Sequence, residues 1–201
     1  MDDGQQVFVV DDDADVRDSM RGMLETNGFE AHSFSSAGQF LAGSDTRHGC
    51  LIADIRMSDM SGLELQDEII KRKMEMAVII MTGHGDVPQA IRAMKAGAID
   101  FLEKPFNREA MLVSVRRALI VGAEARSRNT QTRLARDLLA SLTPRERSVL
   151  DILVAGRANK VVAHELSISP RTVEVHRAHI MGKMKASSMA ELVRAVSIGG
   201  H

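Results

Sequence analysis

The sequence predicts a doubly wound α/β fold with a five-stranded parallel sheet, followed by a small all-α domain of four helices. Two observations support this prediction. Over residues 6–121, short apolar runs alternate five times with amphipathic helical patterns, as in parallel sheets with helices on both faces. From residue 141 onward, apolar positions recur only at helical spacing. We therefore expect two domains, residues 1–121 and 141–201, joined by a linker over residues 122–140.

The first part of the chain contains five candidate strands, each a short apolar run bounded by turn residues. They lie near residues 6–10, 30–34, 50–53, 77–81 and 99–102. A helical pattern follows each strand, near residues 15–27, 36–42, 62–72, 87–96 and 107–121. Turn signals such as Asn27-Gly28 and Ser61-Gly62 separate these elements.

The second part of the chain follows a polar segment, residues 124–139, which has neither proline nor glycine. It should form a helical linker, and a continuation of the helix before it is the second option. Thr143-Pro144-Arg145-Glu146 then has the residues of a helix start, with an N-cap threonine, proline at the first position and glutamate at the third. That helix should end near Gly156. Further helices are expected near residues 159–166, 170–184 and 188–197.

Composition and charge narrow the class of protein. Residues 1–121 carry 20 acidic and 13 basic side chains, whereas residues 122–201 carry 7 and 13. This asymmetry favours nucleic acid as the partner of the basic part; ordinary variation of surface charge is the alternative.

The one cysteine, Cys50, lies in an apolar run and indicates a buried thiol in a reducing compartment. The apolar runs are too short to cross a bilayer and the first residues do not resemble a signal peptide, so we expect a cytoplasmic protein with no membrane partner.

Five polar residues follow or close the apolar runs of four predicted strands. Asp11 and Asp12 come after residues 7–10, Asp54 after residues 50–53, Thr82 after 77–81, and Lys104 shortly after the last strand. In an open parallel sheet, ligands bind beyond the carboxyl ends of the strands. We therefore expect these side chains to converge on one site.

The chemistry of these side chains suits phosphoryl transfer. Carboxylates are hard ligands for Mg²⁺ (or Mn²⁺), which also takes water and phosphate oxygens. Lys104 can balance the charge of a phosphoryl group, and the Thr82 hydroxyl can hydrogen-bond to it. Asp54 stands alone on the central strand and is the candidate acceptor, while Asp11 and Asp12 form the metal pair. Aspartates that merely cap the following helices are the alternative for any one of these residues.

The helix expected over residues 170–184 has two different faces. At about 100° per residue, Val173, Ile180 and Met184 share one face and should pack into a core. The helix before it and Ser167-Ile168-Ser169 complete a helix-turn-helix, whose second helix fits a major groove. The candidate DNA-contacting residues are Lys160, Arg171, Thr172, Glu174, Val175, His176, Arg177, Ala178, His179 and Lys183. A protein-interaction domain with solvated charges is the alternative, and His176 also fits a structural role at the edge of the core.

Four sequence blocks resemble the signature of a response-regulator receiver domain, which has a flavodoxin-like fold. They are Val9-Val10-Asp11-Asp12-Asp13, Asp54-Ile55-Arg56-Met57, Met81-Thr82-Gly83-His84-Gly85 and Phe101-Leu102-Glu103-Lys104-Pro105-Phe106. Residues 141–201 resemble the DNA-binding domain of NarL/FixJ (LuxR-type) regulators. Leu142-Thr143-Pro144-Arg145-Glu146, Asn159-Lys160 and Thr172-Val173 carry that likeness, with His176 and Lys183. Met81–Pro88 and Phe101–Phe106 place the sequence nearest the FixJ-type subgroup.

The resemblance implies a role for each receiver residue. Asp54 would accept phosphate from a sensor histidine kinase. Asp11, Asp12, Asp54 and the Arg56 backbone carbonyl would hold Mg²⁺. Lys104 would contact the phosphoryl group, and Thr82 and Phe101 would act as the switch. The Lys104–Pro105 bond is expected to be cis, and Arg56 and His84 to tune attack by water.

The resemblance also implies the output. The phosphorylated chain would form a homodimer through a face around Val87, Ala90, Met94 and Phe101. It would bind double-stranded promoter DNA and work with RNA polymerase. It would not be an enzyme, apart from its own phosphorylation and slow dephosphorylation. Ser58 stands where the family usually has proline, and Glu174 and Ala178 stand where relatives can have lysine.

Two other functions remain open from the sequence. A hydrolase with an aspartyl-phosphate intermediate usually has a second carboxylate two residues after the nucleophile, where this chain has Arg56. The second alternative keeps the receiver and gives residues 141–201 a protein-binding role.

Overall fold

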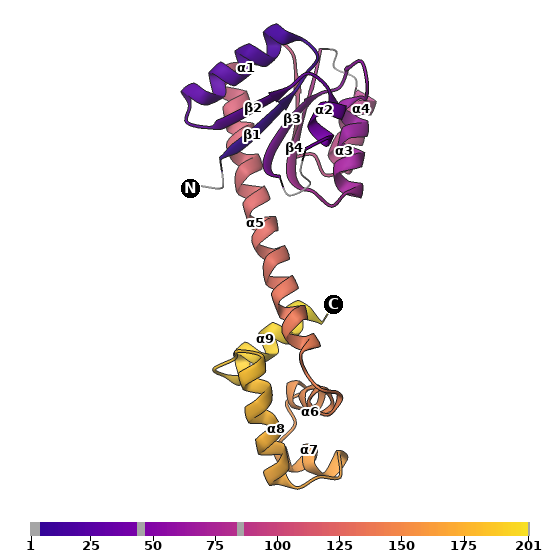
Figure 1. The fold of residues 1–201 in the computed structure, drawn as a ribbon, viewed down its shortest axis with the longest axis vertical. Helices are drawn as coiled ribbons and strands as arrows, with labels where there is room; N and C mark the ends of the chain where they lie inside the picture. Colours follow the sequence, from indigo (N-terminus) through magenta and orange to yellow (C-terminus); the bar gives the residue numbers. More distant parts are fainter. Residues whose placement is uncertain (1–4, 44–46, 84–86, 201) are drawn as a thin grey trace. The chain divides into compact units, whose positions relative to one another are not determined.

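The computed structural model describes residues 5–83, except 44–46, and residues 87–200. The chain divides into two compact units, Met1–Arg126 and Ser127–His201; the first has an apolar core on each face of its sheet, and the second has one core. Each unit is described by itself below. Figure 1 shows the elements of both.

The first unit contains a five-stranded parallel sheet with the strand order β2-β1-β3-β4-β5. The strands are β1 (Gln6–Val10), β2 (Glu30–Phe34), β3 (His48–Asp54), β4 (Glu75–Thr82) and β5 (Asp100–Glu103). The helices are α1 (Ala14–Thr26), α2 (Ala37–Leu41), α3 (Gly62–Lys71), α4 (Val87–Lys95) and α5 (Arg108–Ala140). The predicted doubly wound fold is confirmed.

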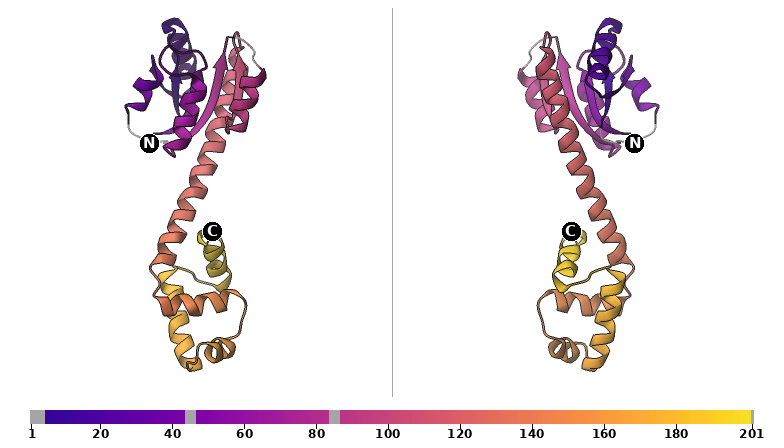
Figure 2. Two further views of the ribbon diagram at one scale, coloured as in Figure 1. Left: turned by 90° about the vertical axis from the view of Figure 1, so that its right-hand side faces the viewer. Right: turned by 90° about the vertical axis from the view of Figure 1, so that its left-hand side faces the viewer.

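The central strands are buried on both faces, which is why they appear in the sequence as unbroken apolar runs. Phe8 and Val10 point into a core shared with α2, α3 and α4, whereas Val7 and Val9 point into a core shared with α1 and α5. Figures 1 and 2 show these helices on the two sides of the sheet. The predicted burial of Cys50 is also confirmed, and burial raises the pKa of its thiol well above the usual range.

Some element boundaries differ from the prediction. β3 and β4 begin two residues earlier than expected, because backbone pairing of His48 with Glu75 extends the ladder beyond the apolar runs. The helix expected to end at residue 121 continues as α5 to Ala140. Residues 122–140, expected as a helical linker, are thus helical within α5. The exact domain borders stay a prediction.

The second unit is formed by the end of α5 and four further helices around one apolar core. These helices are α6 (Pro144–Val154), α7 (Asn159–Glu165), α8 (Pro170–Lys183) and α9 (Met189–Gly199). The predicted core face of α8 is confirmed, since Val173 and Ile180 are fully buried and Met184 nearly so. Among the described helices of the chain, none has both the length and the apolar character needed to cross a membrane.

A capping box at the start of α6 also holds α8. Thr143 accepts a hydrogen bond from the Glu146 backbone N–H, and the Glu146 carboxylate accepts one at 2.8 Å from the Thr143 backbone N–H. The same carboxylate oxygen lies 2.6 Å from Nζ of Lys183, at the end of α8. The hydrogen bonds from Lys183 and then from Thr143 lower the pKa of Glu146 to about 2. One buried carboxylate thus joins the ends of two helices.

Shortening a core side chain of the second unit should destabilise that unit. Leu150 of α6 is fully buried, and Leu150→Ala should lower the free energy of unfolding by about 2–5 kcal/mol, because it leaves a cavity. Urea unfolding followed by circular dichroism measures the loss. Val175→Ala is the matched control, since Val175 is half exposed and its shortening should change stability by no more than about 0.5 kcal/mol. Equal losses for both variants would contradict the assigned core.

The Glu146 carboxylate should make the stability of this unit depend on pH. Its pKa is lowered on folding, so its contribution is full above the ordinary glutamate pKa of 4.5 and is lost as the pH falls towards about 2. Glu146→Gln should therefore lower the melting temperature by several degrees at pH 7, with a smaller deficit at pH 3.5. Glu165→Gln, at an exposed position of α7, should have little effect at either pH. A deficit for Glu146→Gln that is the same at both pH values would exclude this role.

Candidate functional site

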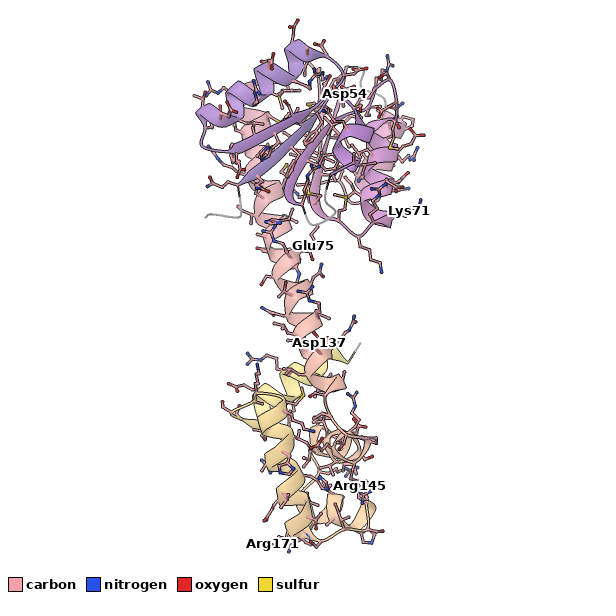
Figure 3. The ribbon with its side chains drawn as sticks, in the orientation of Figure 1. Asp54, Lys71, Glu75, Asp137, Arg145 and Arg171 are labelled. Carbon is pink, nitrogen blue, oxygen red and sulfur yellow. The ribbon has the colours of Figure 1, made fainter. Side chains whose placement is uncertain are left out.

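The carboxyl ends of the central strands meet at one edge of the sheet. Asp11 follows β1, Asp54 ends β3, Thr82 ends β4 and Lys104 follows β5. The register pairs Val10 with Ala53, Asp54 with Met81 and Thr82 with Glu103, so these strand ends lie at one level. In Figure 3, Asp54 lies at the opposite edge of the sheet from Glu75, the first residue of β4.

Three of the five predicted residues are in direct contact. Nζ of Lys104 lies 2.7 Å from Oδ2 of Asp11 and 2.7 Å from Oδ1 of Asp54. Both aspartates are buried, at 1% and 6% exposure. Burial lowers the pKa of Lys104, but the hydrogen bonds and charges of Asp54 and Asp11 outweigh burial and raise it above its usual value. The ammonium group therefore stays charged between the two carboxylates.

Backbone groups fix the other oxygens of these carboxylates. The Asp13 N–H donates to Oδ1 of Asp11 at 2.9 Å, and the Arg56 N–H donates to Oδ2 of Asp54 at 2.7 Å. Arg17 donates from its guanidinium to the Asp11 backbone carbonyl at 2.8 Å. The sequence predictions did not include Asp13 or Arg17. Asp13 had a usable signal, because an aspartate just before an apolar helical pattern is a typical N-cap, and it caps α1.

The remaining predicted receiver residues lie around this cluster. Asp12 is exposed, Thr82 is buried, and its backbone carbonyl accepts a hydrogen bond from the Lys104 N–H at 2.7 Å. Phe101 is half-buried against the core beside α2, α3 and α4. The predicted cis Lys104–Pro105 bond is confirmed. His84, predicted to tune attack by water, lies outside the described residues.

The donor set has the chemistry that Mg²⁺ prefers. Asp11, Asp12 and Asp54 offer hard carboxylate oxygens, and Mg²⁺ needs only one or two of them beside water and phosphate. Within the described ranges, no three acidic, histidine or cysteine side chains form a ready-made ligand group. Lys104 already neutralises part of the negative charge. These residues therefore fit a hydrated Mg²⁺ ion better than a metal held entirely by side chains.

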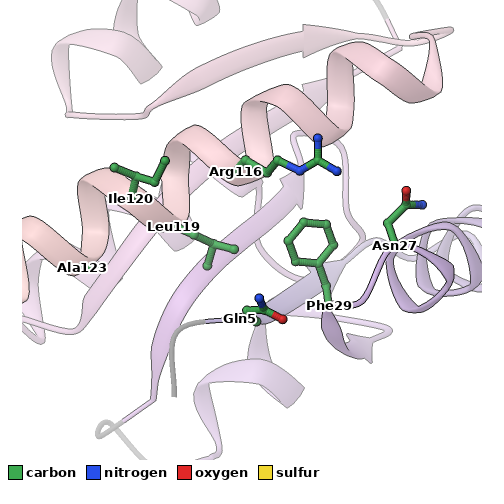
Figure 4. Close-up of a pocket in the computed structure, with 7 residues that line it drawn as sticks. All are labelled: Gln5, Asn27, Phe29, Arg116, Leu119, Ile120 and Ala123. Atoms are coloured by element: carbon green, nitrogen blue, oxygen red, sulfur yellow. The ribbon is translucent and has the colours of Figure 1, made fainter. Parts of the chain in front are cut away.

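Two hollows of the first unit differ in their relation to this site. One lies beside Lys104 and is lined by residues of α1 and of the segment after β5, namely Asp15, Val16, Ser19, Met20, Pro105 and Phe106. The other lies near the opposite end of β1, among Gln5, Phe29, Arg116 and neighbouring residues of α5 (Figure 4). Only the first adjoins the charged cluster.

The second unit exposes most of the predicted DNA-contacting residues on or next to α8. Arg171 lies at the N-terminal end of the helix (Figure 3), and Val175 is half exposed although it is apolar. Exposed side chains also occur at Lys160, Glu174, Ala178 and His179, and half-buried ones at Thr172, His176 and Arg177.

Two members of the predicted DNA-contacting set have neighbours inside the unit. Nζ of Lys183 is engaged by Glu146, so this side chain has a structural contact that the sequence prediction missed. His176 lies at the edge of the core, and its Nδ1 atom is buried without a hydrogen-bond partner among the described residues. A structural role for both side chains therefore stands beside the predicted DNA contact, which stays a prediction.

Each of the two units matches a known protein family. Residues 7–116 match the response regulator receiver domain, and residues 140–196 match the bacterial regulatory proteins of the luxR family. The transcriptional regulatory protein FixJ of Azorhizobium caulinodans is 50% identical over 196 residues, covering 96% of this chain and 92% of that protein. FixJ of Rhizobium meliloti is 49% identical over 197 residues, 96% of each chain.

Solved structures give the same result. The response regulator StyR matches with a TM-score of 0.85 and 45% identity, over 96% of this chain and 98% of that one. Full-length FixJ from B. japonicum matches with a TM-score of 0.58 and 41% identity, over 98% and 97%. The chain therefore belongs to the transcriptional response regulators that join a receiver domain to a LuxR-type DNA-binding domain.

Proposed function

We propose that Asp54 accepts a phosphoryl group from a sensor histidine kinase and that this modification controls DNA binding by the second unit. The bridge from Lys104 to Asp11 and Asp54 is the observation that supports the assignment. It places one charged ammonium group beside a buried carboxylate on the central strand. Such a pair can hold an incoming phosphoryl group and balance its charge.

The transfer requires an in-line attack by Asp54. A carboxylate oxygen of Asp54 forms the new P–O bond as the donor's P–N bond breaks, and the imidazole leaves with the electron pair. Asp11 and Asp12, with the Arg56 backbone carbonyl, would hold Mg²⁺, which when bound would neutralise charge on the phosphoryl oxygens. Lys104 adds its ammonium group, and Thr82 offers a hydroxyl donor. The hollow beside Lys104, which adjoins the charged cluster, is the proposed approach for the donor side chain.

The face of α4 is the proposed dimer contact. Val87, Ile91 and Met94 are exposed by 68%, 49% and 46%, and their spacing of four and three residues forms one apolar stripe. The predicted face included Val87 and Met94 but missed Ile91. Phe101 is half-buried on β5, which pairs with β4 up to Thr82, and we infer that it links this face to the charged cluster. A second phosphorylated copy that covers the stripe would place two α8 helices on two DNA half-sites.

The output of the second unit is promoter binding through α8. Val175 and Ala178 can meet a thymine methyl group in the major groove, whereas Lys160 and Arg171 are exposed for phosphate contacts. RNA polymerase is the expected downstream partner. We argue against a hydrolase that turns over phosphate esters. Such enzymes have a proton-donating carboxylate two residues after the nucleophile, where this chain has Arg56.

Removal of the acceptor carboxylate should abolish phosphorylation. Asp54→Asn should lose labelling by the cognate kinase or by a radiolabelled acyl phosphate, together with the gain in dimer that accompanies labelling. Protein-bound label and light scattering measure the two effects. Asp67→Asn, at an exposed position of α3, is the control and should be labelled normally. Normal labelling of Asp54→Asn would place the acceptor elsewhere.

Loss of exposed cations near α8 should weaken DNA binding in a salt-dependent way. Lys160→Ala and Arg171→Ala should each reduce the slope of log K against log salt by about 0.9, because each removes one phosphate contact. Gel-shift titration at several salt concentrations measures the slope. Arg194→Ala, exposed on α9, is the control and should leave the slope unchanged. A slope that none of the three variants alters would remove α8 from the interface.

A further inference from the structure

The loop between β3 and α3 is attached to α2 through Asp59. The Asp59 carboxylate accepts hydrogen bonds from the backbone N–H of Gly38 at 2.7 Å and of Ala37 at 3.4 Å. These are N–H groups of the first turn of α2, which have no partner within the helix. Gly38 leaves room for this approach, since a Cβ atom there would lie 3.2 Å from Oδ2 of Asp59. The contact joins residues 21 positions apart in the sequence.

The helix end of this contact is firmly held. Ala37 and Phe40 of α2 are fully buried in the core beneath β1 and β3. Slight burial raises the pKa of Asp59, but the hydrogen bonds from the backbone N–H groups of Gly38, Met60 and Ala37 outweigh it and lower the pKa. Asp59 therefore remains a carboxylate at neutral pH and also complements the positive end of the helix dipole.

The other end of the contact leads to the phosphoacceptor. Arg56 lies three residues before Asp59, and its backbone N–H donates to Oδ2 of Asp54. The loop is closed at its base, where the Gly62 N–H donates to the Ile55 carbonyl at 3.2 Å. A Cβ atom at Gly62 would lie only 2.4 Å from the Asp54 carbonyl oxygen, so the loop is packed tightly against the acceptor residue. Between base and tip, Ser58 is exposed.

We propose that Asp59 is a positioning residue for phosphoryl transfer, which acts by holding the loop so that the Arg56 backbone orients the Asp54 carboxylate. This inference rests on the proposed role of Asp54. Two fixed points define the loop: its base at Gly62 and its tip at α2. Release of the tip removes the polar contact that holds residues 56–61 to α2, leaving the base and the partly buried Met57 and Met60 to hold the loop. The Arg56 N–H then samples positions away from Oδ2. Misplacement of a reacting group by about 1 Å can slow a reaction by about 10²-fold, so even partial loosening should be measurable.

Ser36 offers a control that separates positioning from helix capping. Its hydroxyl caps the same helix by accepting from the Gln39 N–H at 3.1 Å, but Ser36 belongs to the segment before α2 and not to the loop. Ser36→Ala and Asp59→Ala should therefore both loosen α2 and lower the melting temperature. Only Asp59→Ala should also release the loop.

The test measures the rate of phosphorylation of the full chain by a small acyl phosphate at saturating Mg²⁺. Asp59→Ala should slow labelling by about 3- to 10-fold, whereas Ser36→Ala should label at the rate of the unmodified chain. Asp59→Asn should recover part of the rate, because its amide oxygen still accepts a hydrogen bond. Circular dichroism melting shows that each variant is folded at the assay temperature.

The outcomes separate this inference from the proposed function. A normal rate for Asp59→Ala would overturn the positioning role, as would equal slowing by Ser36→Ala or a folded Asp59→Asn no faster than Asp59→Ala. Normal labelling of Asp54→Asn would instead overturn the acceptor assignment itself.

Discussion

The charged bridge at the carboxyl edge of the sheet is the interaction on which the first unit's chemistry depends. Two buried carboxylates, Asp11 and Asp54, come from neighbouring strands, and the repulsion between their charges would destabilise the site if no cation lay between them. Lys104 removes that conflict by contacting both. It comes from β5, beyond the intervening β4, so its side chain must reach across the end of that strand. The Lys104 backbone N–H donates a hydrogen bond to the Thr82 carbonyl, which fixes the position from which the side chain extends.

The bridge also explains how the site can serve as a switch. The ammonium group that balances two carboxylates at rest is the same group that would meet a phosphoryl group on Asp54. Under the proposed function, a new dianionic group would change the charge that Lys104 must balance, and Thr82 at the end of β4 and Phe101 within β5 would respond. A shift between two arrangements requires only that the modified site favours one of them.

The features that could be predicted from the sequence are those that a local pattern of apolar residues determines. The strand 7–10 is unbroken in apolar character because both its faces are buried, and this made the sheet and its functional edge predictable. The starts of β3 and β4, His48 and Glu75, are polar and are strands only because each pairs with the other. The second half of α5 is mostly polar, so the sequence allowed its continuation of the preceding helix without requiring it, and the burial of Ala135 and Leu139 was not predicted.

Contacts between distant polar residues left no signal at all in the sequence pattern. Asp59 and Gly38 lie 21 positions apart, and Lys183 and Glu146 lie 37 apart. None of these residues interrupts or completes an apolar period, so neither pairing could be derived from one sequence. Lys183 was therefore assigned to DNA when its nearest described partner is a carboxylate in its own unit. Long-range polar pairs become visible only when the fold brings their backbones together.

The buried thiol of Cys50 can serve as a probe of local unfolding in the first unit. The protein contains neither tryptophan nor tyrosine, so it lacks the usual fluorescent markers of folding. Its single thiol lies at the middle of the sheet, between Val7 and Ala77, and is fully shielded from solvent. Its side chain lies in the core between the sheet and helices α1 and α5, so a thiol reagent reaches it when this core opens. The rate of alkylation of Cys50 therefore measures local unfolding of the first unit. The rest of the chain has no cysteine and does not contribute to this rate.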